Sequence, residues 1–588
     1  MPRRAASTVW AVIAAAALVV TGAIGAWRAA VTGADFMYDL EQPRSPLARA
    51  TPTVRDAGTP RLARRVALII VDGLRLDASR QMPALARLRA IGVDGAARSH
   101  YPSWSRPNYV SILTGVPPQA SGVRTNRHYT PVVLDTLMDR ARAAHLRSAS
   151  ASDNSPLPAL FLRPIDPAAS DAMDDVDIDV MDDPESDEAL AAAGLALRSA
   201  FDDSRYAPWP GGVIEAARAQ LADGAELQVV LIGLVDDAGH ADGAASDAYR
   251  AAVVTADRFV AQIVAGLDLT RDAVVVVADH GHTDRGGHGG LEPEVMAVPL
   301  VAAGAGIRPG AAPIEARLID VAPTVATLLG VAAPGHGLGR TLTEVLTLDP
   351  VAVAVRQQAD AERQAANRAI VAASTRVTLT RELSRRGLRV AGAIAVGLVL
   401  VIGALWLRRR GGLVLAWRTL VLGVPAFFVV YYVMVAALGQ RFSPSFLPAR
   451  GDIAFELAKF GVIGVVAHVG AGWLVLRRQK TLAERLALAN GSATVGLFFT
   501  MVPAMLLWAL FPPPYTRVPG PTLLVVIPAL NVAVALYALS ILLALLLEVT
   551  VFFARALDPA ARLARLERAA ATARRQLDRP EPPEPPSA

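Results

Sequence analysis

The sequence contains no cysteine among its 588 residues. This absence excludes disulfides, thiolate metal sites and cysteine nucleophiles. Charged residues are also scarce, at 19%, whereas hydrophobic residues make up 53% and the mean hydropathy is +0.37. These values exclude a disordered chain and fit poorly with a purely soluble enzyme. The length predicts two or more structural units.

Positive charge is present in slight excess, with a net charge of +5. Almost all of it is arginine, and much of that arginine flanks long apolar runs, where membrane topology explains it. We therefore expect no nucleic-acid partner and take the charge as a guide to orientation in a membrane.

Six apolar runs approach the ~20 residues that a helix needs to cross a bilayer. The first, Val9–Ala26, follows Arg3 and Arg4 and is either a cleaved signal peptide or an uncleaved anchor. We favour the anchor, because the run is longer than a usual signal-peptide core. The other five runs are Val390–Leu407, Leu420–Gly439, Phe460–Leu476, Ala493–Phe511 and Leu523–Leu547.

Arginine is concentrated after the second, fourth and sixth runs and is sparser in the alternate loops. By the positive-inside rule, both termini are cytoplasmic and residues 35–385 lie outside. Arg385, Arg386 and Arg389 oppose this orientation but are outnumbered. We predict an integral protein of a plasma membrane, which we expect to be bacterial, with a periplasmic catalytic domain.

The middle of the chain has the composition of an α/β domain. Short Val/Ile-rich runs alternate there with helical patterns such as Ala244–Leu267, which predicts a sheet covered on both faces. The runs are Val66–Val71, Val229–Leu234, Ala273–Ala278 and Ala297–Ala302. The acidic segment Asp166–Glu188 is interpreted as a solvated loop, with cation binding as the alternative. The predicted regions are an N-terminal transmembrane helix (1–34), a tether (35–60), the catalytic domain (61–350), a helical stalk (351–388), a five-helix transmembrane domain (389–556) and a cytoplasmic tail (557–588).

Acids and histidines follow several apolar runs directly. Asp72 ends the first strand pattern, Asp236 and His240 follow the second, and Asp279 and His280 follow the third, with His288 in a Gly-rich loop just beyond. Carboxyl ends of strands are where α/β sheets bind ligands. Imidazole and carboxylate without thiolate favour two divalent cations, zinc best and manganese as the alternative.

A candidate nucleophile lies in a different stretch. Ser105 precedes Arg-Pro and opens an apolar helical pattern, so it lies at a helix amino end, where free amides favour an anion. The alternative is an ordinary capping serine. A nearby metal would turn its hydroxyl into an attacking group.

Together these residues resemble the alkaline phosphatase superfamily. The matching strings are Val-Asp72-Gly-Leu-Arg, Ser105-Arg-Pro-Asn, Asp236-Asp-Ala-Gly-His and Asp279-His-Gly-His-Thr-Asp-Arg-Gly-Gly-His288-Gly-Gly. They are most similar to the type I phosphodiesterase/nucleotide pyrophosphatase group and to the ethanolamine phosphate transferases of glycolipid-anchor synthesis. The resemblance implies an α/β domain with an alkaline-phosphatase-like central sheet flanked by helices. Together with the apolar runs, the expected fold also includes an all-α membrane domain with one N-terminal and five C-terminal transmembrane helices.

The resemblance also implies roles for individual residues. Asp236, His240 and His288 would hold one metal, and the other would be held by Asp72, Asp279, His280 and the Ser105 oxygen. Asn126 would bind a phosphoryl oxygen, because an amide donor stabilises developing negative charge. The implied enzyme is a two-metal phosphodiesterase or phosphotransferase that works through a phospho-Ser105 intermediate on a phosphoester, which could be carried by a membrane lipid.

The sequence departs from the family pattern at several positions. Ser105 stands where many phosphodiesterases have threonine, and His282 stands where methionine is frequent, so His282 competes with His288 as a ligand. The alternatives are a sulfatase-like hydrolase, or a transporter or sensor with a degenerate outer domain. The sulfatase motif, however, requires an arginine where Tyr109 stands, and the ionisable groups within the spans, such as His468 and Glu548, are few for a conduction path.

Overall fold

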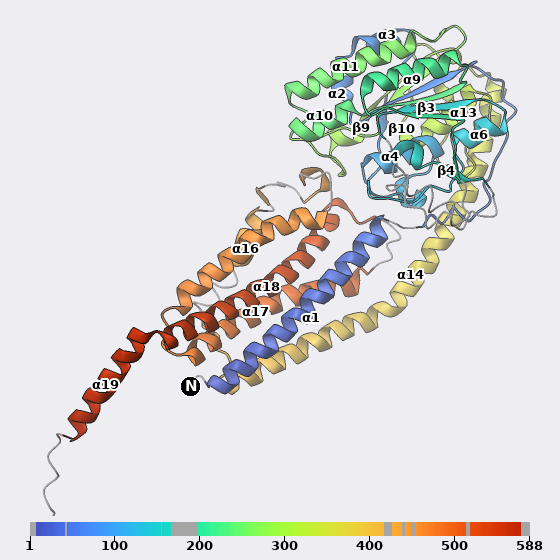
Figure 1. Ribbon diagram of the computed structural model, residues 1–588. Helices are drawn as coiled ribbons and strands as arrows, with labels where there is room; N and C mark the ends of the chain where they lie inside the picture. The colour runs from blue at the N-terminus through green and yellow to red at the C-terminus, as the bar shows by residue number, and fades with distance from the viewer. Residues whose placement is uncertain are drawn as a thin grey trace, which may run out of the picture.

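The computed structural model describes residues 7–41, 44–154, 156–165, 197–416, 426–434, 436–437, 442–447, 453–512 and 518–577. An α/β domain lies at one end of a bundle of long helices, and the two are joined by α1 and α14 (Figure 1). The predicted acidic loop Asp166–Glu188 and the chain after Pro580 lie outside the described residues.

The outer domain is built on an eight-stranded mixed sheet with the order β10-β2-β9-β8-β1-β7-β3-β6. Strands β8, β1, β7, β3 and β6 run parallel to one another, and β9 is antiparallel to both β8 and β2. The bounds are Val66–Val71 (β1), Val93–Arg98 (β2), Ser148–Ser152 (β3), Asp203–Tyr206 (β6), Leu227–Ile232 (β7), Ala273–Val277 (β8), Ala297–Gly304 (β9) and Ala316–Arg317 (β10).

The central strands are buried along their whole length, as their continuous apolar sequences predict. One layer of helices contains α3 (Pro83–Ile91), α9 (Pro210–Ala222) and α11 (Asp247–Val264), and the other contains α4 (Ser105–Thr114), α6 (Leu137–Ala143) and α13 (Val321–Leu328). Each Å² of apolar surface removed from water contributes roughly 25 cal/mol to stability. The burial of the sheet between two layers of helices is therefore the main source of the domain's stability. The predicted α/β fold with helices on both faces is confirmed.

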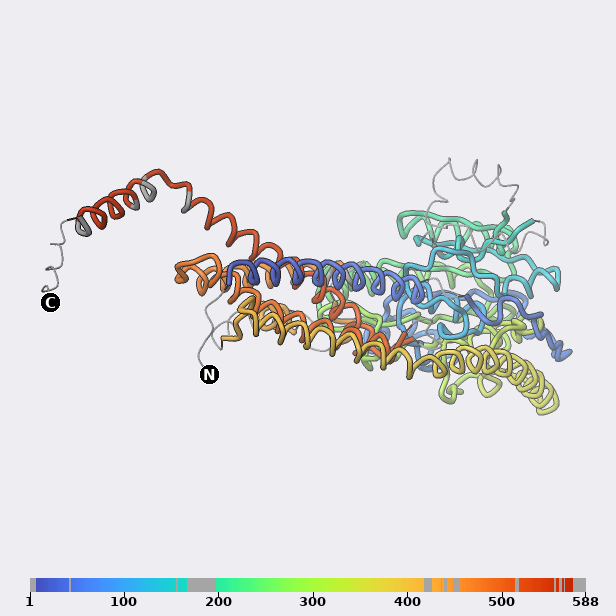
Figure 2. The backbone as a smooth tube through the Cα atoms, turned by 90° about the horizontal axis from the view of Figure 1, so that it is seen from below, coloured from blue at the N-terminus to red at the C-terminus, as the bar shows by residue number. Residues whose placement is uncertain are grey.

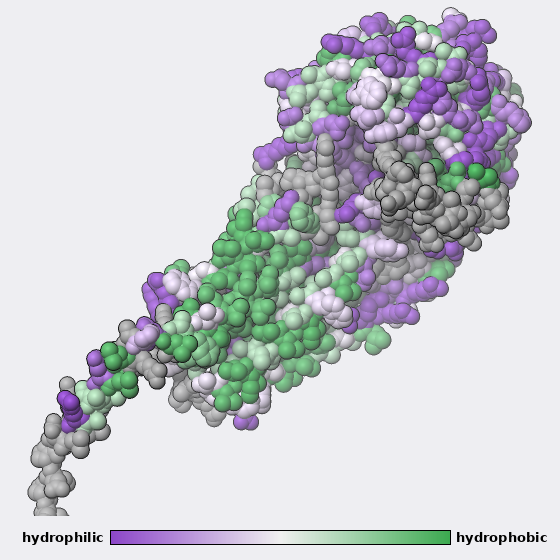
Figure 3. Space-filling model, viewed as in Figure 1, coloured by the Kyte–Doolittle hydropathy of each residue, from purple (hydrophilic) through white to green (hydrophobic). Residues whose placement is uncertain are grey.

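Among the described residues, five helices are long and apolar enough to cross a membrane by length and composition. They are α1 (Thr8–Glu41), α14 (Pro350–Arg409), α16 (Ile453–Leu476), α17 (Leu482–Leu510) and α18 (Pro521–Leu557). Figure 3 shows apolar residues over these helices and polar residues over the outer domain. The predicted span Leu420–Gly439 lies partly outside the described residues, and its residues 426–434 are helical.

Two predicted boundaries differ from the structure. The tether was expected to begin at residue 35, but α1 continues to Glu41 because Phe36 and Leu40 are fully buried against the bundle. The stalk and the second span form one continuous helix of 60 residues, α14, which Figure 2 shows running from the outer domain along the bundle. Residues Pro559–Leu577 of the predicted tail are also helical (α19).

A buried ion pair joins two helices of the bundle. The guanidinium of Arg485 on α17 donates to Glu548 Oε2 on α18 at 2.9 Å, and both side chains are almost fully buried. Removing one partner of such a pair leaves a charge without compensation. Glu548, considered in the sequence as a possible transport residue, therefore has a structural role.

Substitution Glu548→Ala is expected to lower the free energy of unfolding of the detergent-solubilised protein by about 3 kcal/mol, because it leaves Arg485 buried and unpaired. Denaturant titration measures the free energy of unfolding of both proteins. The control is Glu567→Ala on the exposed surface of α19. Equal stability of the two variants would contradict the importance of the pair.

Candidate metal centre

Three carboxylates meet at the carboxyl ends of three neighbouring strands. Asp72 follows β1, Asp279 follows β8, and Asp236 lies in the first turn of α10 (Leu234–Asp242), directly after β7. Because the three strands are parallel and in register, their ends lie at one edge of the sheet. Gly73, with φ of +70°, permits the close approach: a Cβ there would lie 2.8 Å from Asp236 Cα.

The histidines complete the cluster. His280 Nε2 lies 3.3 Å from Asp72 Oδ1 and 3.3 Å from Asp279 Oδ2. His240, one turn after Asp236 on α10, has its Nε2 3.5 Å from Asp236 Oδ2 and 3.0 Å from His288 Nε2. The structure thus brings together all the metal-ligand candidates taken from the sequence.

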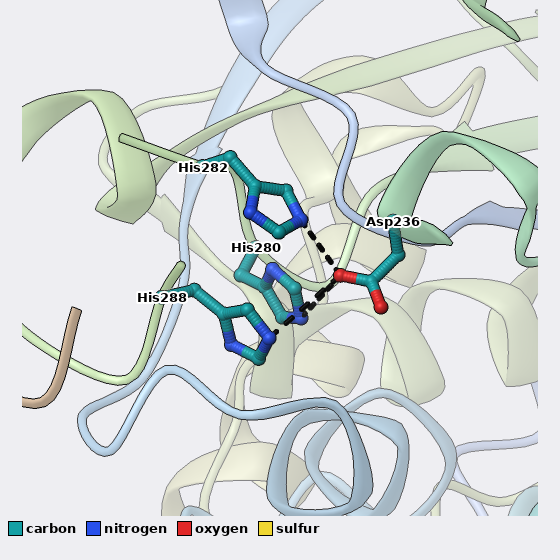
Figure 4. A group of neighbouring side chains, drawn as sticks. All are labelled: Asp236, His280, His282 and His288. Carbon is teal, nitrogen blue, oxygen red and sulfur yellow. Dashed lines mark hydrogen bonds and ion pairs between the residues drawn. The ribbon is translucent and has the colours of Figure 1, made fainter. Parts of the chain in front are cut away.

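His282 belongs to the same cluster. Its Nε2 lies 2.7 Å from Asp236 Oδ1, closer than His280 at 3.9 Å or His288 at 3.7 Å, and all three imidazoles face this carboxylate (Figure 4). Among the residues that the structure describes, two groups have ligand atoms close enough to share a cation: Asp236, His280, His282 and His288, and Asp72, Asp279 and His280. The sequence raised His282 only as a competitor of His288, whereas both are present at one site.

Ser105 lies at the first position of α4 and is buried, with its Oγ 3.1 Å from His280 Nε2. The helix ends at Gly115, whose left-handed conformation provides the cap. Asn126 Oδ1 accepts a hydrogen bond from the Arg106 amide at 3.0 Å, which fixes Asn126 beside the amino end of α4. Among the described residues, the amide NH2 of Asn126 has no hydrogen-bond partner, so it is available as a donor.

The electrostatics of the cluster favour a cation. Burial raises the pKa of Asp72 well above its usual value, and the neighbouring charges of Asp279 and Asp236 add to this. Burial and the charge of Asp236 raise the pKa of Asp279 to about 7. Burial lowers the pKa of His280 to about 3 and also lowers that of His288, so both imidazoles are neutral and able to ligate.

Two carboxylate oxygens in this cluster have no hydrogen-bond partner among the described residues. They are Asp72 Oδ1 and Asp279 Oδ2, both buried. A buried acceptor without a donor is costly, and a divalent cation satisfies it. The residues therefore fit metal ions of the kind that oxygen and imidazole ligands hold.

Two supporting tyrosines were not identified from the sequence as part of the site. Tyr109, one turn after Ser105 on α4, donates a hydrogen bond to Asp72 Oδ2. Tyr249 donates to the Gly73 carbonyl and accepts from the Arg75 amide, which fixes the turn after Asp72. Tyr109 could have been found from the sequence, because a spacing of four residues places it on the same face of the helix as Ser105. No local sequence pattern links Tyr249 to Gly73.

A protein-family model described as "Type I phosphodiesterase / nucleotide pyrophosphatase" matches residues 66–290. The match includes every candidate site residue and confirms the resemblance drawn from the sequence strings. Similar curated proteins include GPI ethanolamine phosphate transferase 1 of Gibberella zeae, 25% identical over 51% of this chain, and that of Homo sapiens, 24% identical over 48% of it. The chain spans about a third of the length of these relatives, 33% and 32%.

Solved structures with some similarity include the alkaline phosphatase PafA and murine ectonucleotide pyrophosphatase/phosphodiesterase 5. The first is 13% identical with a TM-score of 0.35 and covers 49% of this chain and 99% of its own. The second is 12% identical with a TM-score of 0.34 and covers 46% and 96%. A 2-O glycosaminoglycan sulfatase has the same TM-score, 0.34. At these TM-scores the similarities carry no argument about activity.

Zinc affinity should depend on pH, because protons compete with the cation for Asp279. The pKa of this carboxyl is about 7 without metal, so it is mostly ionised at pH 8 and mostly protonated at pH 6. We expect affinity to fall at least about tenfold from pH 8 to pH 6, by competition with one proton. Zinc titration against a chelator of known affinity measures this, and a pH-independent affinity would contradict it.

Proposed function

We propose that this protein is a membrane-anchored, metal-dependent phosphodiesterase or phosphotransferase that works through a phospho-Ser105 intermediate. The observation that carries the proposal is the position of Ser105 Oγ, which is buried, 3.1 Å from His280 Nε2, and next to a cluster of three carboxylates of which Asp72 and Asp279 are buried. The family-model match over residues 66–290 supports the same reaction class.

The metals are proposed to be two divalent cations, zinc rather than manganese, because the ligands are imidazole and carboxylate. Asp236, His240 and His288 would hold one, with His282 next to Asp236. Asp72, Asp279, His280 and Ser105 Oγ would hold the other. When bound, the pair would lower the pKa of the Ser105 hydroxyl and stabilise the leaving-group oxygen.

The protein's own residues supply positioning and charge stabilisation. Ser105 Oγ loses its proton to solvent and forms a bond to phosphorus as the bond from phosphorus to the leaving-group oxygen breaks. The leaving group departs as an alkoxide, which takes a proton from solvent to become the alcohol. The side-chain amide of Asn126 donates to a phosphoryl oxygen, where negative charge grows in the transition state. Tyr109 holds Asp72 in place through its hydroxyl.

The phospho-Ser105 intermediate is then resolved by water or by an acceptor hydroxyl. Both outcomes use the same residues, so the acceptor decides between hydrolysis and transfer. Relatives named as GPI ethanolamine phosphate transferases support transfer of a substituted phosphoryl group, and the helices of the membrane domain favour a substrate carried by a lipid. The outer domain and metal centre are proposed to lie outside the cytoplasm.

Replacement of Ser105 by alanine tests the nucleophile. Ser105→Ala removes the attacking oxygen and is expected to lower kcat on a phosphodiester model substrate by at least about 10³-fold, while most of the bound zinc is kept. Ser111→Ala is the matched control, because its hydroxyl bonds only to the Pro107 carbonyl within the same helix. Full turnover by Ser105→Ala would rule out the covalent mechanism.

Replacement of Asn126 tests stabilisation of the transition state. Asn126→Ala removes one amide donor, and loss of a single donor of this kind costs about 10²-fold in kcat. KM and zinc content are expected to change little. Steady-state kinetics with the same model substrate measures the effect, and a kcat equal to that of the wild type would remove Asn126 from the mechanism.

A further inference from the structure

The loop that carries His288 is rich in glycine and is held by contacts from two parts of the chain. Gly286, Gly287 and Gly289 all have φ between +90° and +108°, a region that favours glycine. Such a backbone has little conformational preference of its own. The position of His288 therefore depends on the contacts that hold the loop.

The first set of contacts comes from Ser103, just before the nucleophile. His288 Nδ1 lies 2.8 Å from the Ser103 carbonyl. Ser103 Oγ accepts from the Gly289 amide and donates to the Gly290 carbonyl, each at 2.9 Å. This side of the loop is fixed by the outer domain itself.

The second set of contacts comes from the membrane bundle. A turn formed by residues 442–447, which includes a 3-10 helix at Pro444–Phe446, lies between the predicted third and fourth spans. In Figure 1 this orange segment lies between the bundle and the outer domain. Its flanking residues Phe442 and Leu447 pack on the apolar core of the bundle, and so does Trp104 of the outer domain.

Ser445, at the centre of this turn, is fully buried and bonds to the outer domain twice. Its Oγ accepts a hydrogen bond from the Gly290 amide at 2.8 Å and donates one to Glu292 Oε2 at 2.6 Å. Glu292 is itself buried, and a hydrogen bond to a carboxylate is about twice as strong as a neutral one.

The fit around the loop is close. A Cβ on Gly287 would lie 2.5 Å from the Ser445 carbonyl oxygen, and one on Gly289 would lie 2.5 Å from Trp104 Nε1 and 3.1 Å from Pro444 Cβ. The loop thus runs between Trp104 on one side and the membrane turn on the other. Only glycine permits this approach from both sides.

We propose that Ser445 of the membrane domain is a positioning residue for His288, so that the metal centre is completed by a turn from the transmembrane bundle. The inference rests on the proposed function, because it takes His288 as a metal ligand. Ser445 acts through Gly290 and Glu292 and touches neither the substrate nor the cation. Groups that orient metal ligands in this way commonly change metal affinity 10–100-fold when they are removed.

The turn also provides a matched control. Ser443 is buried in the same segment, and its Oγ has no hydrogen-bond partner among the described residues. Ser443→Ala and Ser445→Ala remove the same atom two positions apart, and both oxygens lie against Gly290, but only the second substitution breaks hydrogen bonds to Gly290 and Glu292. A difference between the two variants therefore reports on those contacts rather than on the volume of the turn.

The test measures zinc affinity of the full-length protein in detergent by competition with a chelator. Ser445→Ala is expected to weaken one of the two zinc ions about tenfold and to leave the other unchanged, whereas Ser443→Ala binds both like the wild type. Zinc affinities of Ser445→Ala and Ser443→Ala within twofold of each other would overturn the proposal.

Two further outcomes keep this test separate from that of the catalytic function. If Ser445→Ala does not yield folded protein, Glu292→Gln takes its place, because it keeps the turn intact and weakens the same hydrogen bond. Glu292→Gln is expected to lower the affinity for the same zinc ion. An unchanged zinc affinity in this variant overturns the proposal. If the wild type binds zinc but cleaves no phosphoester, the proposed function fails while the comparison of variants still decides the role of Ser445. A wild type that binds no zinc overturns both.

Discussion

The gathering of three carboxylates, two of them fully buried, at one edge of the sheet is the constraint on which the rest of the site depends. Asp72 and Asp279 cannot both be ionised beside Asp236 without compensation, and the raised pKa values of Asp72 and Asp279 express this cost. A fold retains such a cost where function requires it. Divalent cations would remove it, with the imidazoles of His280 and His288, whose pKa values are lowered, among the further ligands.

The helical bundle contacts this site through one of its turns. The bundle provides apolar helices and a buried ion pair between Arg485 and Glu548, and it sends the turn at residues 442–447 to the Gly-rich loop. Under the proposed function, a centre in contact with this bundle suits a phosphoester whose other end is held in the lipid.

Much of the outer domain could be predicted from the sequence, because its central strands are continuous apolar runs and its site residues follow them directly. The strand of residues 66–71 was predicted with its observed bounds. The extension of α1 to Glu41 was missed, because it depends on where Phe36 and Leu40 pack. The contacts of His282 with Asp236 and of Ser445 with Gly290 join positions far apart in the chain, and no local pattern encodes them.

Anomalous X-ray diffraction at the zinc edge, from crystals of the zinc-loaded protein, tests the central claim most directly. The account predicts two peaks about 4 Å apart, one beside Asp236 and one between Asp72 and Asp279, as in two-metal phosphoryl-transfer sites. No peak at this edge of the sheet, or a single peak away from these carboxylates, would contradict it.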